Sequence, residues 1–277
     1  MNKKAYSYPS VLTIAGFDSI GGAGIQGDIK TISALGCYAT SVLTALPVQN
    51  TCGVQSVYPI PAEVVGAQLR AVLDDVFPDA IKIGVVHTAD VVDAIVDILR
   101  QYPGLPVVFD PVMVSTSGHR LLDDSTIATI VKKLFPMAAI VTPNLDEAGV
   151  LTGMPVHTVD DMRAAGKKII ELGARSVLLK GGHLYSAKLT SLYFTNDGEI
   201  QEHSFEKIDT PNTRGTGCAL SSAIASYIAR EGSLPDAVTL AQEYVYQAIW
   251  DGKEVQMGKG NGPLNHFFDP QKLIINP

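Results

Sequence analysis

Short apolar runs alternate with stretches of helical spacing along most of this 277-residue chain. The apolar runs lie at residues 11–15, 41–46, 80–83, 106–109, 138–141 and 176–179, and a further short strand is expected at 54–59. The stretches of helical spacing lie at 23–35, 62–76, 89–100, 145–151, 159–172, 218–230 and 234–251. Strands that are buried on both faces and separated by helices are typical of a mostly parallel sheet with helices on both sides. The alternation therefore predicts an α/β fold.

One segment, 189–206, departs from this alternation. Runs at 191–194 and 202–205 flank Asn196-Asp197-Gly198, which is a strong signal for a hairpin turn. The chain shows no internal repeat, no low-complexity tract and no linker that would divide it. We therefore expect a single domain over residues 1–277, with one hairpin added to the sheet.

Composition excludes several classes of protein. Hydrophobic residues make up 46% and charged residues 18%, which favours a well-buried globular protein. The net charge of −7 argues against nonspecific binding to nucleic acid. Cys37, Cys52 and Cys218 are too few and too scattered for a disulfide framework or a zinc site. No apolar run approaches the roughly 20 residues that span a bilayer, so we expect a cytoplasmic protein without a membrane partner.

Residues that directly follow the predicted strands are the first candidates for a site. In a parallel sheet, ligands bind at the carboxyl ends of the strands. The residues at these positions are polar or glycine in nearly every case. They are 16–24, Gln49, Asn50, Gly84, Asp110, 144–147 and 180–182.

The turn Gly215-Thr216-Gly217-Cys218 directly precedes an apolar helical stretch. A glycine-rich turn at a helix start points free backbone N–H groups at one spot, and the helix dipole adds to their attraction for phosphate. Such a turn is by itself a weak signal, because a tight connection also uses small residues. Cys218 is either an inert buried thiol or, at this helix start, a group whose thiolate is favoured.

Three further positions each allow two interpretations. Asp110 either caps a turn before Pro111 or supplies a carboxylate to Mg²⁺ that is bound to phosphate. Glu147 and Asn144 either form a capping arrangement at a helix start or help to order the metal and its waters. Lys180 either ends a strand or binds phosphate as a point charge.

A second glycine-rich turn spans residues 16–28. The acidic residue that a dinucleotide site needs after the next strand is missing, so close approach of a small polar ligand is the better interpretation. Gln49 and Asn50 are either ordinary loop amides or groups that read a heteroaromatic ring through paired donors and acceptors. His87, His183 and His266 lack the spacing of metal ligands and are expected to be structural.

In this order, the motifs resemble the ribokinase-like superfamily of small-molecule kinases. More closely, they resemble the hydroxymethylpyrimidine and phosphomethylpyrimidine kinases of thiamine biosynthesis. The resemblance covers nearly the whole chain, and several motifs in the correct order are far more specific than any one of them. The motifs lie at 12–16, 21–26, 49–54, 82–84, 110–113, 142–144, 147–148, 180–183, 215–218 and 258–263, with His266 after them.

The resemblance implies a three-layer α/β/α kinase that uses ATP and Mg²⁺ and forms a homodimer. Its substrates would be 4-amino-5-hydroxymethyl-2-methylpyrimidine and the monophosphate of that alcohol. The hairpin at 189–206 would then be either a flap over the nucleotide site or an edge of the sheet. The implied site residues are Gly215, Gly217 and Cys218 for the anion hole and the base; Gln49, Gly16, Ala23, Asp28 and Val85 for the pyrimidine; Lys180, Asn144 and Thr216 for ATP; and Asp110 and Glu147 for Mg²⁺.

Two alternatives stay open. A pyridoxal, pyridoxine or pyridoxamine kinase would use the same machinery, including the cysteine, and a non-catalytic pyrimidine-binding protein would have lost it. The chain also departs from the family pattern, with Ser19-Ile20, Val85 and Arg214 where Pro-Ser, Met and His are frequent. Val85 is expected to loosen the substrate pocket, and Arg214 to add positive charge near the phosphates. Both departures affect substrate range more than reaction type.

Overall fold

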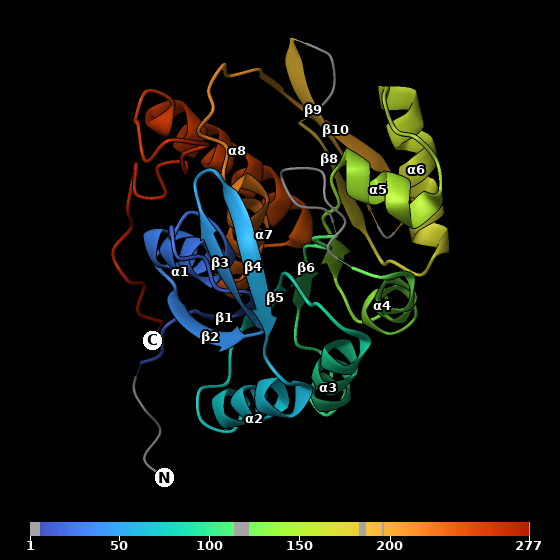
Figure 1. Ribbon diagram of the computed structural model, residues 1–277, viewed down its shortest axis with the longest axis vertical. Helices are drawn as coiled ribbons and strands as arrows, with labels where there is room; N and C mark the ends of the chain where they lie inside the picture. The colour runs from blue at the N-terminus through green and yellow to red at the C-terminus, as the bar shows by residue number, and fades with distance from the viewer. Residues whose placement is uncertain (1–5, 114–121, 183–186, 196, 277) are drawn as a thin grey trace.

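An eight-stranded sheet forms the centre of the molecule (Figure 1). The computed structural model describes residues 6–113, 122–182, 187–195 and 197–276, and within them the strand order is β10-β9-β8-β7-β6-β5-β1-β2. The parallel strands are β1 (Ser10–Ala15), β2 (Tyr38–Leu43), β5 (Ala80–Ile83), β6 (Val107–Phe109), β7 (Ile140–Val141) and β8 (Val177–Gly181). The antiparallel strands are β9 (Lys188–Phe194) and β10 (Ile200–Glu206). The predicted mostly parallel sheet is confirmed.

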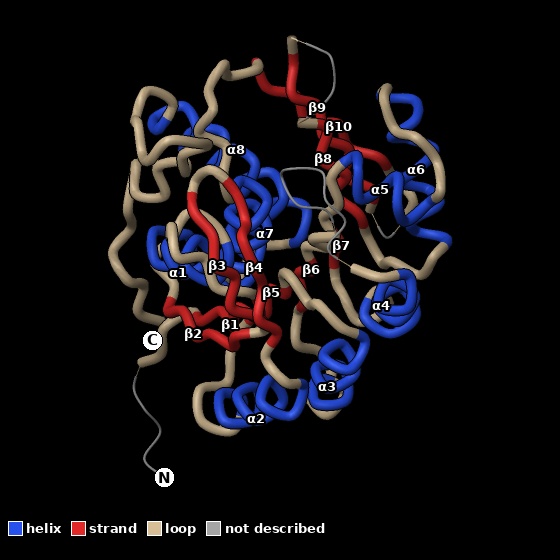
Figure 2. Tube along the Cα trace, viewed as in Figure 1, coloured by secondary structure: helices blue, strands red, loops and turns tan. Residues whose placement is uncertain are grey.

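Helices cover both faces of this sheet (Figures 1 and 2). One face carries α1 (Gly24–Ala34), α7 (Thr216–Ala229) and α8 (Leu234–Gly252). The other carries α2 (Ala62–Leu73), α3 (Ala89–Leu99), α4 (Asp124–Thr129), α5 (Leu145–Thr152) and α6 (Val159–Glu171). Within β1, Leu12 and Ile14 belong to the core under the second set of helices, and Val11 belongs to the core under the first. Because side chains alternate along a strand, β1 contributes apolar side chains to both faces of the sheet.

The predicted strand at 41–46 is wrong, because the chain leaves the main sheet in the middle of that run. β2 ends at Leu43, and β3 (Ala45–Asn50) pairs with β4 (Gly53–Pro59) in a separate two-stranded sheet. Thr44 marks the break: its N–H donates to the Ala15 carbonyl at 3.0 Å, and its hydroxyl donates to the Val85 carbonyl at 2.7 Å. These bonds fasten the base of the β3–β4 hairpin to the carboxyl ends of β1 and β5. Apolar residues on both sides of Thr44, at 42–43 and 45–46, made the run resemble a single strand.

The segment before β7 contains helical structure that the periodicity did not predict. A short helix, α4, begins after Asp123, whose side chain accepts from the Thr126 N–H at 2.7 Å, and continues into a π-helical turn, η1 (Ile130–Leu134). Ile127 and Ile130 pack into the core beside α3. The hairpin predicted at 189–206 is β9–β10, and it forms an edge of the main sheet. Asn196 of its turn and His183 lie outside the described residues.

Candidate active site

Three ionisable side chains meet where β6, β7 and β8 end. Asp110 directly follows β6, Lys180 lies near the end of β8, and Glu147 lies in the first turn of α5. Lys180 Nζ donates to Asp110 Oδ1 at 2.8 Å, and the Thr142 hydroxyl donates to the same oxygen at 3.0 Å. Burial would raise the pKa of Asp110, but the positive charges of Lys180 and Lys82 outweigh burial and hold that pKa below its usual value. Asp110 is therefore an anion at neutral pH.

Glu147 has the capping role that was one of its two predicted interpretations. The Asn144 side chain accepts from the Glu147 N–H at 2.9 Å, and Glu147 Oε2 accepts from the Asn144 N–H at 2.7 Å, which is a complete capping box. The Glu147 side chain is nevertheless buried beside the ion pair. Burial raises its pKa to about 7, with Lys180 lowering and Asp110 raising that value. A structural carboxylate is thus held where a metal or its waters would be bound, and its metal role stays a prediction.

The glycine-rich turn lies against this charged cluster. A Cβ on Gly217 would lie 3.2 Å from Lys180 Nζ and 3.4 Å from Asp110 Oδ2. Gly215 is the N-cap of α7 with a φ of 84°, and a Cβ there would overlap the carbonyl oxygen of Gly22. The left-handed backbone and this close approach both require glycine at 215. The structure therefore brings the predicted anion-hole glycines together with the residues predicted for Mg²⁺ and ATP.

The first turn of α7 leaves backbone donors unused. The Ala219 N–H donates to the Gly215 carbonyl at 2.8 Å, and the Thr216 N–H donates to the Thr213 carbonyl at 3.3 Å. Among the described residues, no acceptor pairs with the N–H groups of Gly217 and Cys218. Free N–H groups at the N-terminus of a helix of 14 residues attract anions. This arrangement suits a transferred phosphoryl group beside Lys180.

Cys218 is a neutral thiol in this site. Burial raises its pKa to about 11; the charge of Lys82 lowers that value, and the charges of Asp28 and Asp110 raise it. Of the two interpretations left open for Cys218, a buried thiol and a favoured thiolate, the direction of this pKa shift agrees with the first, because burial outweighs the charge of Lys82. A Gly24 backbone hydrogen bond also stabilises the ionised form of this sulfur. Cys218 therefore lies between the charged cluster and the turn at residues 22–24.

Asp28 was predicted to line the substrate pocket, and the structure places its side chain in the core. Both of its oxygens accept from Lys82 Nζ, at 2.8 and 3.0 Å, and both residues are fully buried. The hydroxyls of Thr13 and Ser222 donate to the same carboxylate at 2.5 and 2.8 Å. Asp28 thus links α1, β1, β5 and α7 beneath Cys218.

The sequence resembles a known family of kinases over most of its length. A family model described as phosphomethylpyrimidine kinase matches residues 18–265. The chain belongs to the phosphomethylpyrimidine kinase family. It is 44% identical to the hydroxymethylpyrimidine/phosphomethylpyrimidine kinase of Salmonella typhimurium over 93% of this chain and 97% of that protein. The corresponding kinase of Escherichia coli K12 is 43% identical, with the same coverage of both chains.

Solved structures share the ribokinase-like fold. The crystal structure of phosphomethylpyrimidine kinase from Clostridium difficile 630 matches with a TM-score of 0.76 and 41% identity, covering 87% of this chain and 99% of that one. The pyridoxal kinase of Staphylococcus aureus in complex with pyridoxal matches with a TM-score of 0.87 and 31% identity, covering 98% of both chains. The fold class predicted from the sequence is confirmed, and the chain is a kinase of this family.

The remaining predicted pocket residues lie on the side of the site that faces the β3–β4 hairpin. Gly16 follows β1, and its carbonyl accepts from the Ile25 N–H at 2.9 Å. Ala23 is the N-cap of α1, and Val85 follows the end of β5 by two residues. Gln49 lies on β3 and donates to Asp18 at 2.9 Å. Of these positions, Gly16 lies against Gly24 of the turn at residues 22–24, and Gly24 also makes a backbone hydrogen bond to Cys218.

The positive charge that Arg214 was expected to add near the phosphates is paired in the structure. Its guanidinium donates to both oxygens of Asp18, at 2.9 and 3.3 Å, and the Asp18 side chain is only 1% exposed. The charge of Arg214 is therefore balanced where the turn at residues 22–24 meets the start of α7. Asp18 was not singled out from the sequence, although its place after Gly16 at a strand end was a usable signal.

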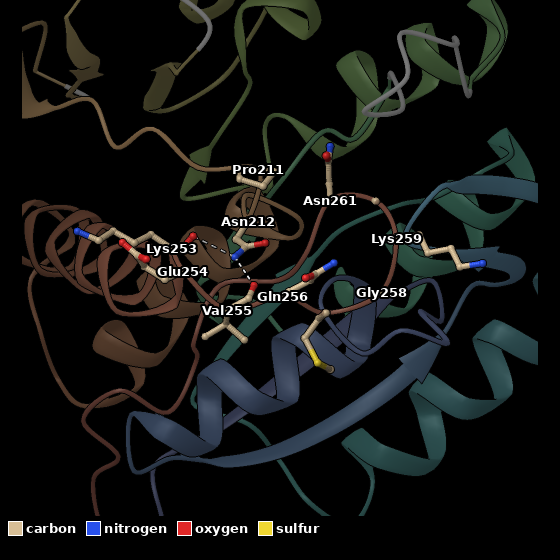
Figure 3. Close-up of a pocket in the computed structure, with 11 residues that line it drawn as sticks. Pro211, Asn212, Lys253, Glu254, Val255, Gln256, Gly258, Lys259 and Asn261 are labelled. Carbon is tan, nitrogen blue, oxygen red and sulfur yellow. Dashed lines mark hydrogen bonds between the residues drawn. The ribbon is translucent and has the colours of Figure 1, made fainter.

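A hollow of about 450 Å³ is lined by Pro211, Asn212 and residues 253–261 (Figure 3). The Asn212 amide shapes its floor by donating to the carbonyls of Gly252, Lys253 and Val255 at 2.8, 3.3 and 2.6 Å. The hollow contains the glycine-rich motif at 258–261, but none of the predicted site residues lines it.

The donor set fits Mg²⁺ better than a transition metal. In the part of the chain that the structure describes, no group of three or more His, Cys, Asp or Glu side chains is arranged to hold a metal ion. Mg²⁺ needs only one or two carboxylates beside phosphate oxygens and water, and Asp110 with Glu147 meets that need. The described residues also contain no helix long and apolar enough to span a bilayer.

Proposed function

We propose that this kinase transfers the γ-phosphoryl group of ATP to 4-amino-5-hydroxymethyl-2-methylpyrimidine, and then phosphorylates the resulting monophosphate. One observation carries the proposal: Gly217 lies beside the Lys180–Asp110 pair at the carboxyl ends of the sheet, and among the described residues the N–H groups of Gly217 and Cys218 have no acceptor. The names of the relatives, which give both pyrimidine substrates, support the choice of ring and of two steps.

In this proposal, the chain contributes positioning and charge. Phosphoryl transfer leaves a protein little covalent chemistry to perform, so most catalysis comes from orientation and from stabilisation of charge on the phosphoryl oxygens. Lys180 binds ATP phosphates with its ammonium, and the N–H groups of Gly217 and Cys218 receive the transferred group. Thr216 and Asn144 border the same space. Mg²⁺, when bound through Asp110 and Glu147, supplies further positive charge to the phosphate oxygens.

Cys218 accepts the proton of the hydroxymethyl group in this proposal. With a pKa of about 11, about one thiol in ten thousand is ionised at pH 7. That fraction is small, but the attacking oxygen loses its proton late in a loose transition state, when its acidity has risen. Lys82, buried nearby, favours the thiolate when it forms. The residue therefore acts as a proton acceptor that is uncharged until the phosphoryl group moves.

One competition assay tests the proposed substrate. Purified protein, MgATP and equal concentrations of the pyrimidine alcohol and pyridoxal are incubated together, and both phosphorylated products are quantified by mass spectrometry. We expect the pyrimidine monophosphate first and its diphosphate later. Preferential phosphorylation of pyridoxal would identify a pyridoxal kinase, the activity that the Staphylococcus aureus neighbour's name gives. Binding of the pyrimidine without ATP turnover would indicate a non-catalytic binding protein.

We also propose that the protein is a homodimer. Leu46 and Tyr58 are directly paired across the β3–β4 hairpin and are 44% and 61% exposed. Val48 and Val54 of the same hairpin are 46% and 49% exposed, so the hairpin presents an apolar surface of the kind that subunit contacts cover. Light scattering coupled to chromatography tests this, and a mass near 29.4 kDa would contradict it. The cytoplasmic location stays a prediction.

A further inference from the structure

The Gln49 side chain is the group predicted to read the ring of the substrate. A glutamine amide can present either its C=O or its NH₂ to a ligand, so its orientation decides what it recognises. In the structure, Gln49 Nε2 donates to Asp18 Oδ1 at 2.9 Å and to the Phe17 carbonyl at 3.4 Å. Among the described residues, none donates to Gln49 Oε1. The Ser19 hydroxyl donates to the Gln49 carbonyl at 2.7 Å and fixes the backbone.

Asp18 can serve this amide only as an acceptor. Its carboxylate receives backbone N–H groups from Ile20 at 3.2 Å, from Gly22 at 3.1 Å and from Ala23 at 2.8 Å, and it receives the Arg214 guanidinium. Burial would raise its pKa, but the Arg214 hydrogen bond and charge and the backbone N–H groups outweigh burial and lower that pKa. A reversed Gln49 amide would place its oxygen against this anion.

We propose that Asp18 is a positioning residue that sets ring specificity by holding Gln49 with Oε1 as the free atom. A fixed acceptor selects a ring that offers an N–H donor at that position, as the exocyclic 4-amino group of the pyrimidine does. A ring with a carbonyl oxygen there meets lone pairs instead. The inference rests on the proposed function, because it concerns how the same site chooses its alcohol.

The location of Asp18 connects this selection to the reacting centre. Asp18 accepts from Ala23, and Gly24, the next residue, makes the backbone hydrogen bond to Cys218. Gly24 has a φ of 53°, and a Cβ there would overlap the Gly16 carbonyl oxygen, so the turn has little freedom to shift. The amide of Gln49 is thus held at a set position relative to the Cys218 thiol.

The test uses two ligands that differ at one exocyclic group. They are 4-amino-5-hydroxymethyl-2-methylpyrimidine and its 4-oxo analogue, whose dissociation constants are measured by calorimetry without ATP. The wild-type protein is expected to bind the amino compound more tightly. In Asp18→Asn, the new amide can donate to Gln49 and let it reverse, so the ratio of the two constants is expected to fall about tenfold. An unchanged ratio in the folded variant would overturn the inference, as would a wild-type protein that binds the two compounds equally.

Two further variants separate acceptor chemistry from packing. Arg214→Lys disturbs the same carboxylate but keeps a cation beside it, and it is expected to retain the wild-type ratio. If the ratio of dissociation constants fell as far in Arg214→Lys as in Asp18→Asn, the geometry of the turn would explain the effect, and the inference would be overturned. Gln49→Ala removes the amide that recognises the ring, and it is expected to lower the ratio as much as Asp18→Asn does. The double variant Asp18→Asn/Gln49→Ala is expected to lower the ratio no further. If Asp18→Asn fails to fold, an unchanged ratio in Gln49→Ala overturns the inference.

The same samples keep the two proposals apart. Addition of MgATP to the wild-type protein with the amino compound measures phosphorylation directly. Tight, selective binding without phosphorylation would contradict the proposed function and leave the role of Asp18 standing. Phosphorylation of both pyrimidines at equal kcat/KM, with equal binding, would support the kinase and contradict the role of Asp18.

Discussion

Two lysine–carboxylate pairs lie near Cys218, and their surroundings differ. Lys82 and Asp28 are fully buried, and the hydroxyls of Thr13 and Ser222 complete the hydrogen bonding of the carboxylate. Every donor around Asp28 comes from the fold itself. A carboxylate whose oxygens all accept hydrogen bonds from the fold cannot exchange these partners for a ligand. The Lys82–Asp28 pair therefore holds four elements together near the Cys218 thiol.

The second pair, Lys180 and Asp110, is open on one side. The Lys180 side chain is 16% exposed, and its ammonium lies against Gly217 at the end of the sheet. An ammonium has three donors in flexible directions, so it can bind a phosphate while it keeps its carboxylate partner. The comparison teaches that similar ion pairs in one site differ in exposure, and we therefore expect the buried pair to serve stability and the partly exposed pair to bind substrate.

Loss of Lys82 is expected to have the largest effect, on stability. Lys82→Met leaves Asp28 as a buried charge without its cation, which typically costs about 3–5 kcal/mol of unfolding free energy. Chemical denaturation measures the loss. The double variant Lys82→Met/Asp28→Asn removes both charges and is expected to recover most of it. A single variant as stable as the wild type would show that this pair is not structural.

Loss of Lys180 is expected to affect activity instead. Lys180→Met removes a positive charge beside the transferred phosphoryl group, and removal of one such stabilising group costs about 100- to 1,000-fold in kcat. Steady-state assays with MgATP and the pyrimidine alcohol measure it, with Lys180→Arg as the control that keeps the charge. Denaturation should show a smaller loss of stability than Lys82→Met does. The distinction between the two pairs would be wrong if Lys180→Met lowered the unfolding free energy by more than it raised the activation free energy.

Cys218 lies between the two pairs and tests which of them the chemistry uses. Cys218→Ala is expected to slow phosphorylation at least about 100-fold, the low end for loss of a general base. Cys218→Ser keeps a weak proton acceptor of similar size and is expected to retain more activity than alanine. Near-normal turnover of Cys218→Ala would remove the residue from the base role, and catalysis would then rest on Lys180 and the backbone N–H groups.

The sequence predicted the partly exposed pair, Lys180 and Asp110, better than the buried pair, Lys82 and Asp28. Asp110 and Lys180 follow or end parallel strands, and parallel strands end at one edge of a sheet, so their meeting follows from topology. Lys82 lies inside the apolar run at 80–83, where its partner Asp28 is 54 residues away and on a helix. Periodicity reports which residues are buried, but it does not report which buried groups meet.

The hairpin and its anchor were missed for a related reason. The run at 41–46 is mostly apolar, and the turn of the backbone at Thr44 depends on hydrogen bonds to Ala15 and Val85, which are distant in sequence. Arg214 was recognised as a departure from the family pattern, but its partner Asp18 lies 196 residues before it. Local patterns thus predicted most of the elements, their order and the meeting of Asp110 with Lys180, whereas the pairing of Arg214 with Asp18 and of Lys82 with Asp28 required the structure.

The smallest expected effect is a dependence of stability on pH that comes from the open side of the site. Burial raises the pKa of Glu147 from 4.5 to about 7, so the folded protein binds a proton there that the unfolded chain has already lost. The stabilisation from this group is complete below pH 4.5 and decreases as pH rises towards 7. Its size is at most about 3 kcal/mol over the whole interval, which is about 1.4 kcal/mol for each pH unit. Glu147→Gln keeps the capping bond to Asn144 but cannot ionise, so its stability relative to the wild type should rise over this pH range. Denaturation curves at several pH values measure the difference. If the unfolding free energies of the two proteins ran parallel across this pH range, Glu147 would be ionised throughout. The partly exposed pair would then stabilise a neighbouring charge as well as the buried pair does.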